Sequence, residues 1–537
     1  MKRNSWLFVL GLALSWGSAL APGAENAARA AAEKPARPKL VLAVVIDQFR
    51  YDYLTRFRAD YHAGLARLLD GGAVYTEAHY IHFPTVTAVG HSTFLTGATP
   101  SVSGIIGNEW YDRAAKHSVT SVSDETTKML GGVPGVSGSS PRRLLVSTFP
   151  DELKMAAKDG PKSMRVVGIS IKDRSAILPA GHMADAAYWF DGDSSHFVTS
   201  DYYMRDLPAW VKAVNDAGPM RKYLGAEWKP LNAAPGDKPF CTLVAGGEEI
   251  PYCGSFEATP FGNELLEEFA EKAVENEHLG RHEGTDVLAL SFSSNDYVGH
   301  RVGPDDPAVR DISIRTDIAL GKLMDFIDAR IGKGNTLVVL TADHGVAPVP
   351  EVNQARHMPG GRIDTKQMRD ALNQALSDKF GTGQWILSGG GETVYLDYET
   401  AAKNTADLRE ARRVAAETLR AMPHVARVFT SDELMTYGGA ADPVGQAVVR
   451  GHYAARSGDI TVIQEPYYLF GGTSGTSHST PYGYDTHVPV IFYGAGVQHG
   501  VYHRTIAPND IAPTLASMFD VERPSGAFGE VLREVVK

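Results

Sequence analysis

Three apolar segments, each followed closely by an aspartate, constrain the fold more than any other feature of this chain. Residues 39–46, 286–292 and 336–341 are nearly continuous apolar runs rich in β-branched side chains. Such runs are typical of strands buried on both faces of a parallel sheet. A fourth apolar run covers residues 488–493. Because helical stretches such as 312–331 separate these runs, the sequence predicts a doubly wound, mostly parallel α/β sheet flanked by helices.

Two segments interrupt this alternation of strands and helices. Residues 185–280 are rich in aromatic residues, proline and glycine, and we expect them to form a cap or insertion near the site. Residues 365–470 contain an amphipathic helix at 405–422, between strand-like runs at 392–396 and 425–429. This second segment is predicted to be a small inserted α+β unit.

The N-terminus has the pattern of a secretory signal. Residues 1–21 begin with Lys2 and Arg3, continue through an apolar run and reach small residues. An uncleaved anchor is the alternative, although the apolar run is shorter than the ~20 residues of a membrane span. We expect residues 22–37 to be a flexible lead-in and residues 38–537 to be the folded, catalytic part. The protein is therefore expected to be periplasmic or secreted, without stable membrane insertion.

Charge and cysteine content narrow the class of protein further. The chain has 52 Lys and Arg against 63 Asp and Glu, a net charge of −11, which argues against nucleic-acid binding. Its two cysteines are Cys241 and Cys253. An exported protein favours a disulfide between them, and two buried thiols are the alternative. The pair cannot form a tetrahedral zinc site without further ligands.

Candidate metal ligands gather where the strands are predicted to end. Ligands of a doubly wound sheet bind outside the carboxyl ends of its strands, so Asp47, Asp296 and Asp343 are expected to share one crevice. His300, four positions after Asp296, lies on the same face if a helix turn begins there. His344 directly follows Asp343 and can be presented in the same turn. Each pair alone is a weak signal, because such an aspartate often only caps a helix.

Together these residues suit two Zn²⁺ ions, although carboxylate-rich ligands without thiols could also hold Mn²⁺ or Fe. The predicted metal ligands are Asp47, Asp296, His300, Asp343, His344 and His487. His478, nine positions before His487, is a weaker candidate, because its Ser- and Thr-rich surroundings indicate a loop. We interpret His82 and His91 as packing residues or neighbours of the site.

Thr87 is the candidate nucleophile. A threonine hydroxyl is nearly inert at neutral pH unless a metal or a base lowers its pKa. A helix is predicted to begin here, Gly90 allows close backbone approach, and the helix dipole favours an incoming anion. The alternative is that Thr87 only caps this helix.

These motifs resemble the alkaline phosphatase superfamily, and within it the type I phosphodiesterase/nucleotide pyrophosphatase group. They are most similar to the branch of secreted monoesterases typified by PafA. The resemblance runs from about residue 39 to the C-terminus, with the motifs in the family order. The matching motifs are Asp47, Pro84-Thr85-x-Thr87, Thr96-Gly97, Gly104-Ile105-Ile106-Gly107-Asn108, Asp296-x-x-x-His300, Asp343-His344-Gly345 and His487.

The resemblance implies a role for each of these residues. One zinc would be held by Asp47, Thr87, Asp343 and His344. The other would be held by Asp296, His300 and His487. Thr87 would form a phosphothreonine intermediate, and Asn108, Lys172 and Arg174 would contact the phosphoryl group. Lys172 and Arg174 are two positions apart, which would place both side chains on one side of an extended segment.

The function implied is that of a zinc-dependent alkaline phosphatase acting on phosphate monoesters, with inorganic phosphate as the product. We expect a monomer that holds two Zn²⁺ and no Mg²⁺, with Lys172 taking the place of a third metal. A phosphodiesterase or nucleotide pyrophosphatase on the same scaffold is the first alternative. A binding protein without catalytic activity is the second, and a sulfatase is disfavoured because the Cys/Ser-x-Pro-x-Arg signature is missing around Thr87.

Overall fold

The computed structural model describes residues 37–234, 236–243, 255–389, 391–439 and 441–536. The predicted signal and most of the lead-in therefore lie outside the described residues. Cys241 takes part in a disulfide, and Cys253, its predicted partner, lies outside the described residues. None of the helices in the described part of the chain has the length and apolar character of a membrane span.

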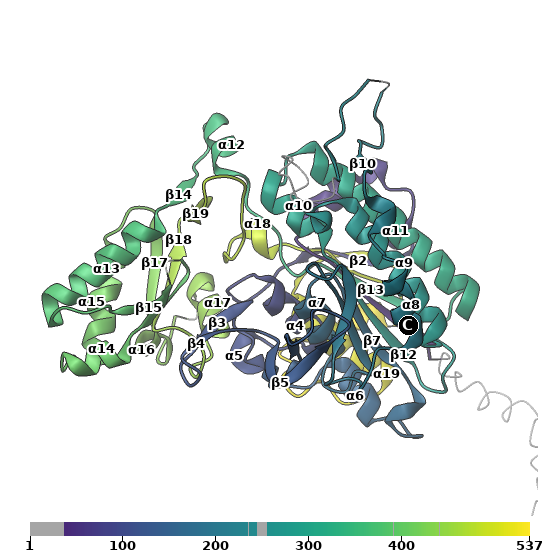
Figure 1. Cartoon of the computed structure of the whole chain (residues 1–537), viewed down its shortest axis with the longest axis horizontal. Helices are drawn as coiled ribbons and strands as arrows, with labels where there is room; N and C mark the ends of the chain where they lie inside the picture. The colour runs from purple at the N-terminus through teal and green to yellow at the C-terminus, as the bar shows by residue number, and fades with distance from the viewer. Residues whose placement is uncertain (1–36, 235, 244–254, 390, 440, 537) are drawn as a thin grey trace, which may run out of the picture. The chain divides into compact units, whose positions relative to one another are not determined.

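An eleven-stranded sheet forms the centre of the molecule (Figure 1). Its middle strand, β1 (Leu40–Ile46), pairs in parallel with β12 (Asp286–Phe292) on one side and with β13 (Thr336–Thr341) on the other. Leu40 lies opposite both Asp286 and Thr336, so the three predicted strands start in register and end at one edge. The strand order is β21-β2-β20-β13-β1-β12-β7-β8-β9-β5-β6.

The other strands of this sheet, in chain order, are β2 (Ala73–Ala78), β5 (Ser123–Leu130), β6 (Ser137–Ser139), β7 (Val166–Ser170), β8 (Ala186–Asp191), β9 (His196–Ser200), β20 (Val490–Gly494) and β21 (Gly500–Ile506). The predicted fourth run is β20, and it pairs antiparallel to β13. Since β7 and β8 are parallel to the central strands, the centre of the sheet is parallel, as predicted. The pairs of β20 with its two neighbours, and those of β9, β5 and β6, are antiparallel, so the whole sheet is mixed.

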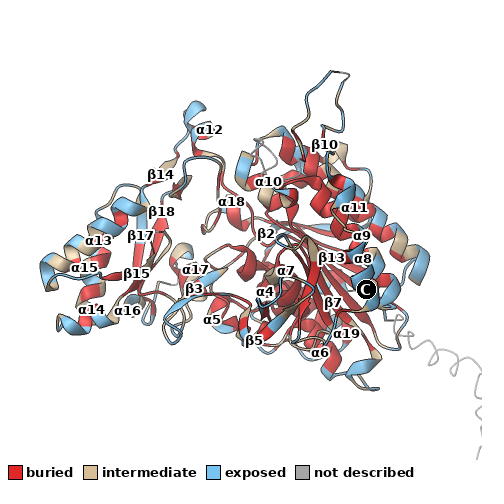
Figure 2. Ribbon diagram, viewed as in Figure 1, coloured by how far each residue is buried: buried red, intermediate tan, exposed pale blue. Residues whose placement is uncertain are grey.

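Helices cover both faces of the sheet, and alternate residues of β1 supply the two cores. Leu42 and Val44 pack in a core with residues of α3 (Gly64–Gly71), α9 (Pro260–Asn276) and α11 (Pro307–Ile331). Val41, Ala43 and Val45 pack in a second core with residues of α4 (Thr87–Thr96), α6 (Phe149–Met155) and α19 (Ile511–Phe519). The central strands are buried on both faces (Figure 2), which confirms the doubly wound α/β prediction.

Residues 185–280 do not form the separate cap or insertion that the sequence predicts. Strands β8 and β9 join the large sheet instead of forming a cap. The aromatic side chains that suggested an insertion lie in the core, where Tyr188 packs edge-to-face against Phe269 of α9. The reason is that strand and helix alternation continues through this segment, so its aromatic residues fill one face of the sheet.

Residues 365–470, the small domain, form a separate four-stranded sheet in the order β15-β16-β18-β17, and all its pairs are antiparallel. Its core includes Trp385, Leu419 and Ile460. Its elements include α13 (Thr365–Phe380), β15 (Ile386–Gly389), β16 (Thr393–Leu396), α15 (Leu408–Arg420), β17 (Val425–Thr430) and β18 (Ile460–Gln464).

Candidate active site

The three predicted aspartates meet at one edge of the large sheet. Asp47 directly follows β1, and Asp343 lies two positions after β13. Asp296 lies in the first turn of α10 (Ser294–Val302), which follows β12. Gln48 links them, because its backbone N–H donates to Asp343 Oδ1 (3.0 Å) and its side-chain amide donates to Asp296 Oδ1 (2.6 Å). The three aspartates therefore lie together at the carboxyl ends of the strands, as expected.

Asp47, Asp343 and His344 form a first, fully buried group whose potential ligand atoms lie within 4.8 Å of one another. His344 Nε2 lies 3.6 Å from Asp47 Oδ1 and 3.4 Å from Asp343 Oδ2. The Nδ1–H of His344 donates to the backbone oxygen of Gly345 (2.9 Å). This hydrogen bond sets the tautomer that leaves the Nε2 lone pair free toward the carboxylates.

Asp296, His300 and His478 form a second group within the same distance limit. His300 Nε2 lies 3.2 Å from Asp296 Oδ1, as expected for residues one helix turn apart. The Nδ1–H of His300 donates to Thr476 O (2.9 Å), and that of His478 donates to Thr85 O (2.8 Å). Both Nε2 atoms are therefore free to bind a cation.

The structure places His478, and not His487, beside Asp296 and His300. His487 forms a β-bridge to His79, which draws it toward β2, and its Nε2 donates to Thr76 O (2.8 Å). With Glu77 and His79 it makes a third possible group. The rings of His79 and His487 stack at 4.3 Å with 17° between their planes, so their in-plane lone pairs do not converge on one ion. The grouping predicted for His487 is wrong.

The first two groups fit divalent cations. Asp47 Oδ1 and Asp343 Oδ2 are buried, and within the described residues neither accepts a hydrogen bond. Burial, and then repulsion by Asp343, raises the pKa of Asp47 well above its usual range. Burial lowers the pKa of both His344 and His478, which favours the neutral imidazole that binds metals. Mixed carboxylate and imidazole donors are ligands that Zn²⁺ prefers.

Thr87 adjoins the first group. It is the first residue of α4, and its hydroxyl lies 3.5 Å from His344 Nε2. The N-cap residue of α4 is Val86, which makes no side-chain capping hydrogen bond. The alternative that Thr87 only caps this helix is therefore wrong. A Cβ on Gly90 would collide with the backbone of Asp343. Glycine at this position therefore lets α4 lie directly against the Asp343 turn.

His91, one turn along α4, supports this arrangement. Its buried Nδ1–H donates to Thr87 O (2.9 Å) and lies 3.2 Å from Asp343 Oδ2, while Nε2 lies 2.8 Å from the Ser291 hydroxyl. Because the Nδ1 proton is donated to Thr87 O, the Asp343 oxygen keeps its lone pairs for another partner. The prediction of a neighbouring role for His91 is confirmed.

Lys172 lies between the two groups, with Nζ 2.6 Å from both Asp47 Oδ2 and Asp296 Oδ2. Burial opposes its charge, but Asp296 and Asp47 outweigh burial and raise the pKa of Lys172. Helix α7 (Asp173–Ala180) begins directly after it, so Arg174 lies in a helix and the expected extended segment is wrong. The Nε of Arg174 is buried without a hydrogen-bond partner in the described part of the chain.

Asn108 and Arg174 line a cavity of about 750 Å³, the active-site cavity. Asn108 Oδ1 accepts a hydrogen bond from the N–H of Ala88 in α4 (2.8 Å), which leaves its NH₂ group to donate to a ligand. The small domain supplies part of the opposite wall. The lining includes Glu109, Tyr111, Arg369, Glu392 and Tyr395.

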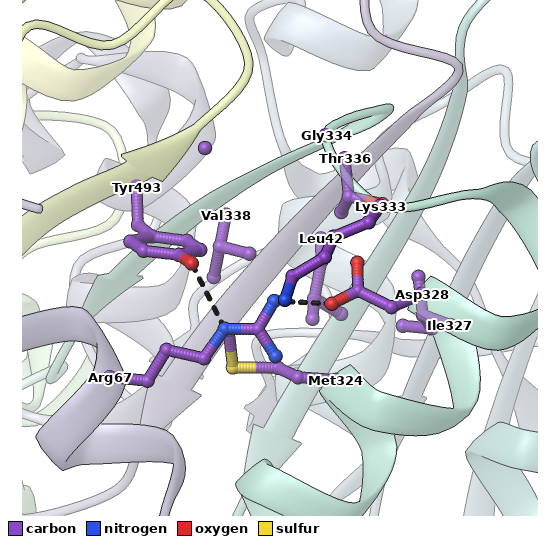
Figure 3. Close-up of a pocket in the computed structure, with 11 residues that line it drawn as sticks. Leu42, Arg67, Met324, Ile327, Asp328, Lys333, Gly334, Thr336, Val338 and Tyr493 are labelled. Atoms are coloured by element: carbon purple, nitrogen blue, oxygen red, sulfur yellow. Dashed lines mark hydrogen bonds and ion pairs between the residues drawn. The ribbon is translucent and has the colours of Figure 1, made fainter. Parts of the chain in front are cut away.

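A second cavity, of about 150 Å³, lies at the other end of the strands, beside Thr336 (Figure 3). Two of its charged groups are paired, because Arg67 contacts Asp328, and the Arg67 Nε donates to Tyr493 Oη (3.0 Å), whereas Lys333 is exposed. None of the six candidate metal ligands lines this cavity.

Sequence comparison identifies the family. The chain matches the model of the type I phosphodiesterase/nucleotide pyrophosphatase family over residues 41–488. The chain belongs to this family. Its fold and relatives place it in the alkaline phosphatase superfamily, as the motifs predicted, and make it a hydrolase of phosphoryl esters.

Three relatives resemble this family member along nearly the whole chain. Alkaline phosphatase PafA of Elizabethkingia meningoseptica is 36% identical over 522 residues, covering 93% of this chain and 95% of PafA. A Myroides odoratus protein named calcium-transporting ATPase is 36% identical over 531 residues, covering 94% and 96%. Alkaline phosphatase PhoV of Synechococcus elongatus is 34% identical over 523 residues, covering 94% of each chain. These names differ, so they do not by themselves define the reaction of this chain.

The crystal structure of wild-type PafA superposes with a TM-score of 0.86 at 34% identity, covering 93% of this chain and 99% of that one. A solved variant of PafA carries substitutions at one threonine, one asparagine, one lysine and one arginine. The threonine and asparagine are 21 positions apart, and the lysine and arginine are two apart. Thr87 and Asn108, and Lys172 and Arg174, have the same spacings here.

His82, five positions before Thr87, has a testable effect on stability. Burial, and then the charge of Arg450, lowers the pKa of His82 to about 3. In the unfolded chain His82 takes up a proton near pH 6.5, whereas in the folded protein it stays neutral down to about pH 3. Protonation therefore favours the unfolded chain, and stability is lost as the pH falls from 6.5 toward 3. When the pH is lowered from 7.5 to 5.0, we expect the free energy of unfolding of wild type to fall by about 2 kcal/mol more than that of His82→Leu.

Denaturant unfolding at both pH values tests this effect, because the contributions of all other groups cancel in the comparison. His499→Gln, at an exposed position, is the control and should behave as wild type. Equal pH dependence in wild type and His82→Leu would show that His82 can be protonated in the folded protein.

Proposed function

We propose that this protein is a zinc-dependent alkaline phosphatase that hydrolyses phosphate monoesters through a phosphothreonine intermediate. The observation that carries the proposal is the position of the Thr87 hydroxyl, 3.5 Å from a histidine of one candidate metal group, with a second group beside it. The spacings shared with the substituted residues of PafA support the same assignment of Thr87, Asn108, Lys172 and Arg174.

Asp47, Asp343 and His344 would hold one zinc, and Asp296, His300 and His478 the other. Bound there, Zn²⁺ would supply a Lewis acid that lowers the pKa of a hydroxyl and neutralises phosphoryl charge. The Thr87 oxygen attacks phosphorus, and the alcohol leaves with the electrons of its P–O bond and takes up a proton. Water then hydrolyses the phosphothreonine, which releases inorganic phosphate and restores Thr87.

The remaining residues act on the phosphoryl oxygens. The helix dipole at the start of α4 favours an anion beside Thr87. Asn108 is held by Ala88 with its NH₂ group available, and Arg174 brings an unpaired buried N–H to the same cavity. These donors stabilise the charge that spreads over the non-bridging oxygens in a loose transition state.

Lys172 and Arg174 favour a monoester over a diester. A monoester dianion carries one more negative charge than a diester and lacks the second ester group. Lys172 offsets the charge of Asp47 and Asp296, which would otherwise repel the substrate, and Arg174 adds a second cation. A phosphodiesterase on the same scaffold would gain little from either residue.

Substrate preference tests the proposal on zinc-loaded protein. We expect a higher kcat/KM for 4-nitrophenyl phosphate than for bis-4-nitrophenyl phosphate. The double variant Lys172→Ala/Arg174→Ala should lose about a hundredfold in kcat/KM on the monoester and less than about tenfold on the diester. A double variant at the exposed residues Arg205 and Lys212, each changed to alanine, is the control. A hundredfold preference for the diester, or equal losses on both esters, would contradict the monoesterase proposal.

A further inference from the structure

Glu392 is a carboxylate in the wall of the active-site cavity that the proposed mechanism does not use. It directly precedes β16 of the small domain, and the N–H of Val462 in β18 donates to its backbone oxygen (2.8 Å). Thr393 and Tyr395 of the same strand also line the cavity. Because a sheet holds its backbone, Glu392 presents its side chain from a rigid element.

The carboxylate of Glu392 has no charged partner in the described part of the chain. Among the described residues, no lysine or arginine forms an ion pair with its side chain, and no side chain donates a hydrogen bond to it. The side chain is half-buried. Burial raises the pKa of Glu392, and only its own backbone N–H opposes this effect. An unpaired, partly desolvated carboxylate is costly unless a ligand supplies the missing partner.

The other charged groups of the cavity are placed differently. Arg174, together with the uncharged Asn108, lines the part of the cavity where the phosphoryl group is proposed to bind, which is called the phosphoryl end. The carboxylate of Asp173 is engaged, because it accepts hydrogen bonds from the Ser139 hydroxyl and from the N–H of Arg174. Glu109 and Arg369 are exposed, and water screens their charges. Of the charged side chains that line the cavity, Glu392 is therefore the one expected to interact most with a leaving group outside the phosphoryl end.

We propose that Glu392 is a specificity-determining residue that selects the leaving group of the substrate. Its carboxylate accepts hydrogen bonds from hydroxyl or amine groups of the alcohol, and it repels leaving groups that carry an additional negative charge. The preferred substrate class is therefore phosphate monoesters of neutral or cationic hydroxylated alcohols, such as sugars, rather than those of hydroxy acids. The inference rests on the proposed phosphatase activity.

Two substrates with the same phosphoryl group test this inference. Glucose 6-phosphate has a neutral, hydroxylated leaving group, and 3-phosphoglycerate has an anionic one. We expect wild type to prefer glucose 6-phosphate, and Glu392→Gln to shift the ratio of the two kcat/KM values about tenfold toward 3-phosphoglycerate. The wild-type ratio should also fall as NaCl rises from about 0.05 to about 0.5 M, whereas that of Glu392→Gln should not.

Glu417→Gln, at an exposed position in α15 of the same domain, is the matched control and should leave the ratio unchanged. A ratio that changes less than twofold in Glu392→Gln, or an equal loss on both substrates in a variant with unchanged thermal unfolding, would overturn the inference. A wild-type protein inactive on every monoester, including 4-nitrophenyl phosphate, would instead overturn the proposed function.

Discussion

Thr87→Ala is expected to lose at least about a thousandfold in kcat on 4-nitrophenyl phosphate, because it removes the attacking oxygen. The variant should fold and keep both zinc ions, since six other side chains supply the two groups. Steady-state kinetics, combined with zinc analysis of the same samples, checks both expectations.

Thr87→Ser is the matched control for this change. It keeps a hydroxyl at the first position of α4 and should retain activity far above that of Thr87→Ala. Near wild-type turnover in Thr87→Ala would exclude a phosphothreonine intermediate. Loss of zinc together with activity would show that Thr87 acts mainly in holding the metal.

His478→Ala and His487→Ala are expected to differ strongly, although the sequence favours the second residue as the ligand. The His478 Nε2 is free beside Asp296, whereas the Nε2 of His487 is bonded to Thr76 O. His478→Ala should therefore reduce zinc content from about two to about one per chain and lower kcat at least about a hundredfold.

His487→Ala should keep about two zinc ions per chain and most of the activity. Its expected effect is a modest loss of stability, because His487 stacks on Tyr51 at 4.5 Å. Zinc lost from His487→Ala but retained by His478→Ala would contradict the assignment made from the structure.

The sequence is sufficient for the parts of the site that depend on local patterns. The strands that end near Asp47 and Asp343 are continuous apolar runs, and buried parallel strands need such runs. The pairing of Asp296 with His300 follows from their spacing, since a helix turn brings residues four apart together.

The choice between His478 and His487 depends on contacts that no local pattern reveals. His478 lies in a loop, and its orientation comes from a hydrogen bond to Thr85, 393 positions earlier in the chain. His487 has the strand context that favoured it, but its bridge to His79 turns it toward another strand. The loop composition around His478 was a poor guide because a loop residue can still be buried.

Two other features also depend on tertiary structure. The spacing of Lys172 and Arg174 suggested an extended segment, yet α7 begins at Asp173, and the helix start separates the two side chains. Glu392 precedes a short strand of the small domain and carries no motif. Its importance appears only because the fold brings that strand to the cavity that contains Asn108 and Arg174.

The central claim is that two cations, held by residues from distant parts of the chain, activate the Thr87 hydroxyl. A crystal structure of the zinc-loaded protein, with anomalous diffraction recorded at the zinc edge, tests it most directly. We predict two anomalous peaks, one among Asp47, Asp343 and His344 and one among Asp296, His300 and His478, with Thr87 Oγ1 about 2.1 Å from the first. A single peak, or a threonine oxygen more than about 4 Å from both ions, would contradict the account.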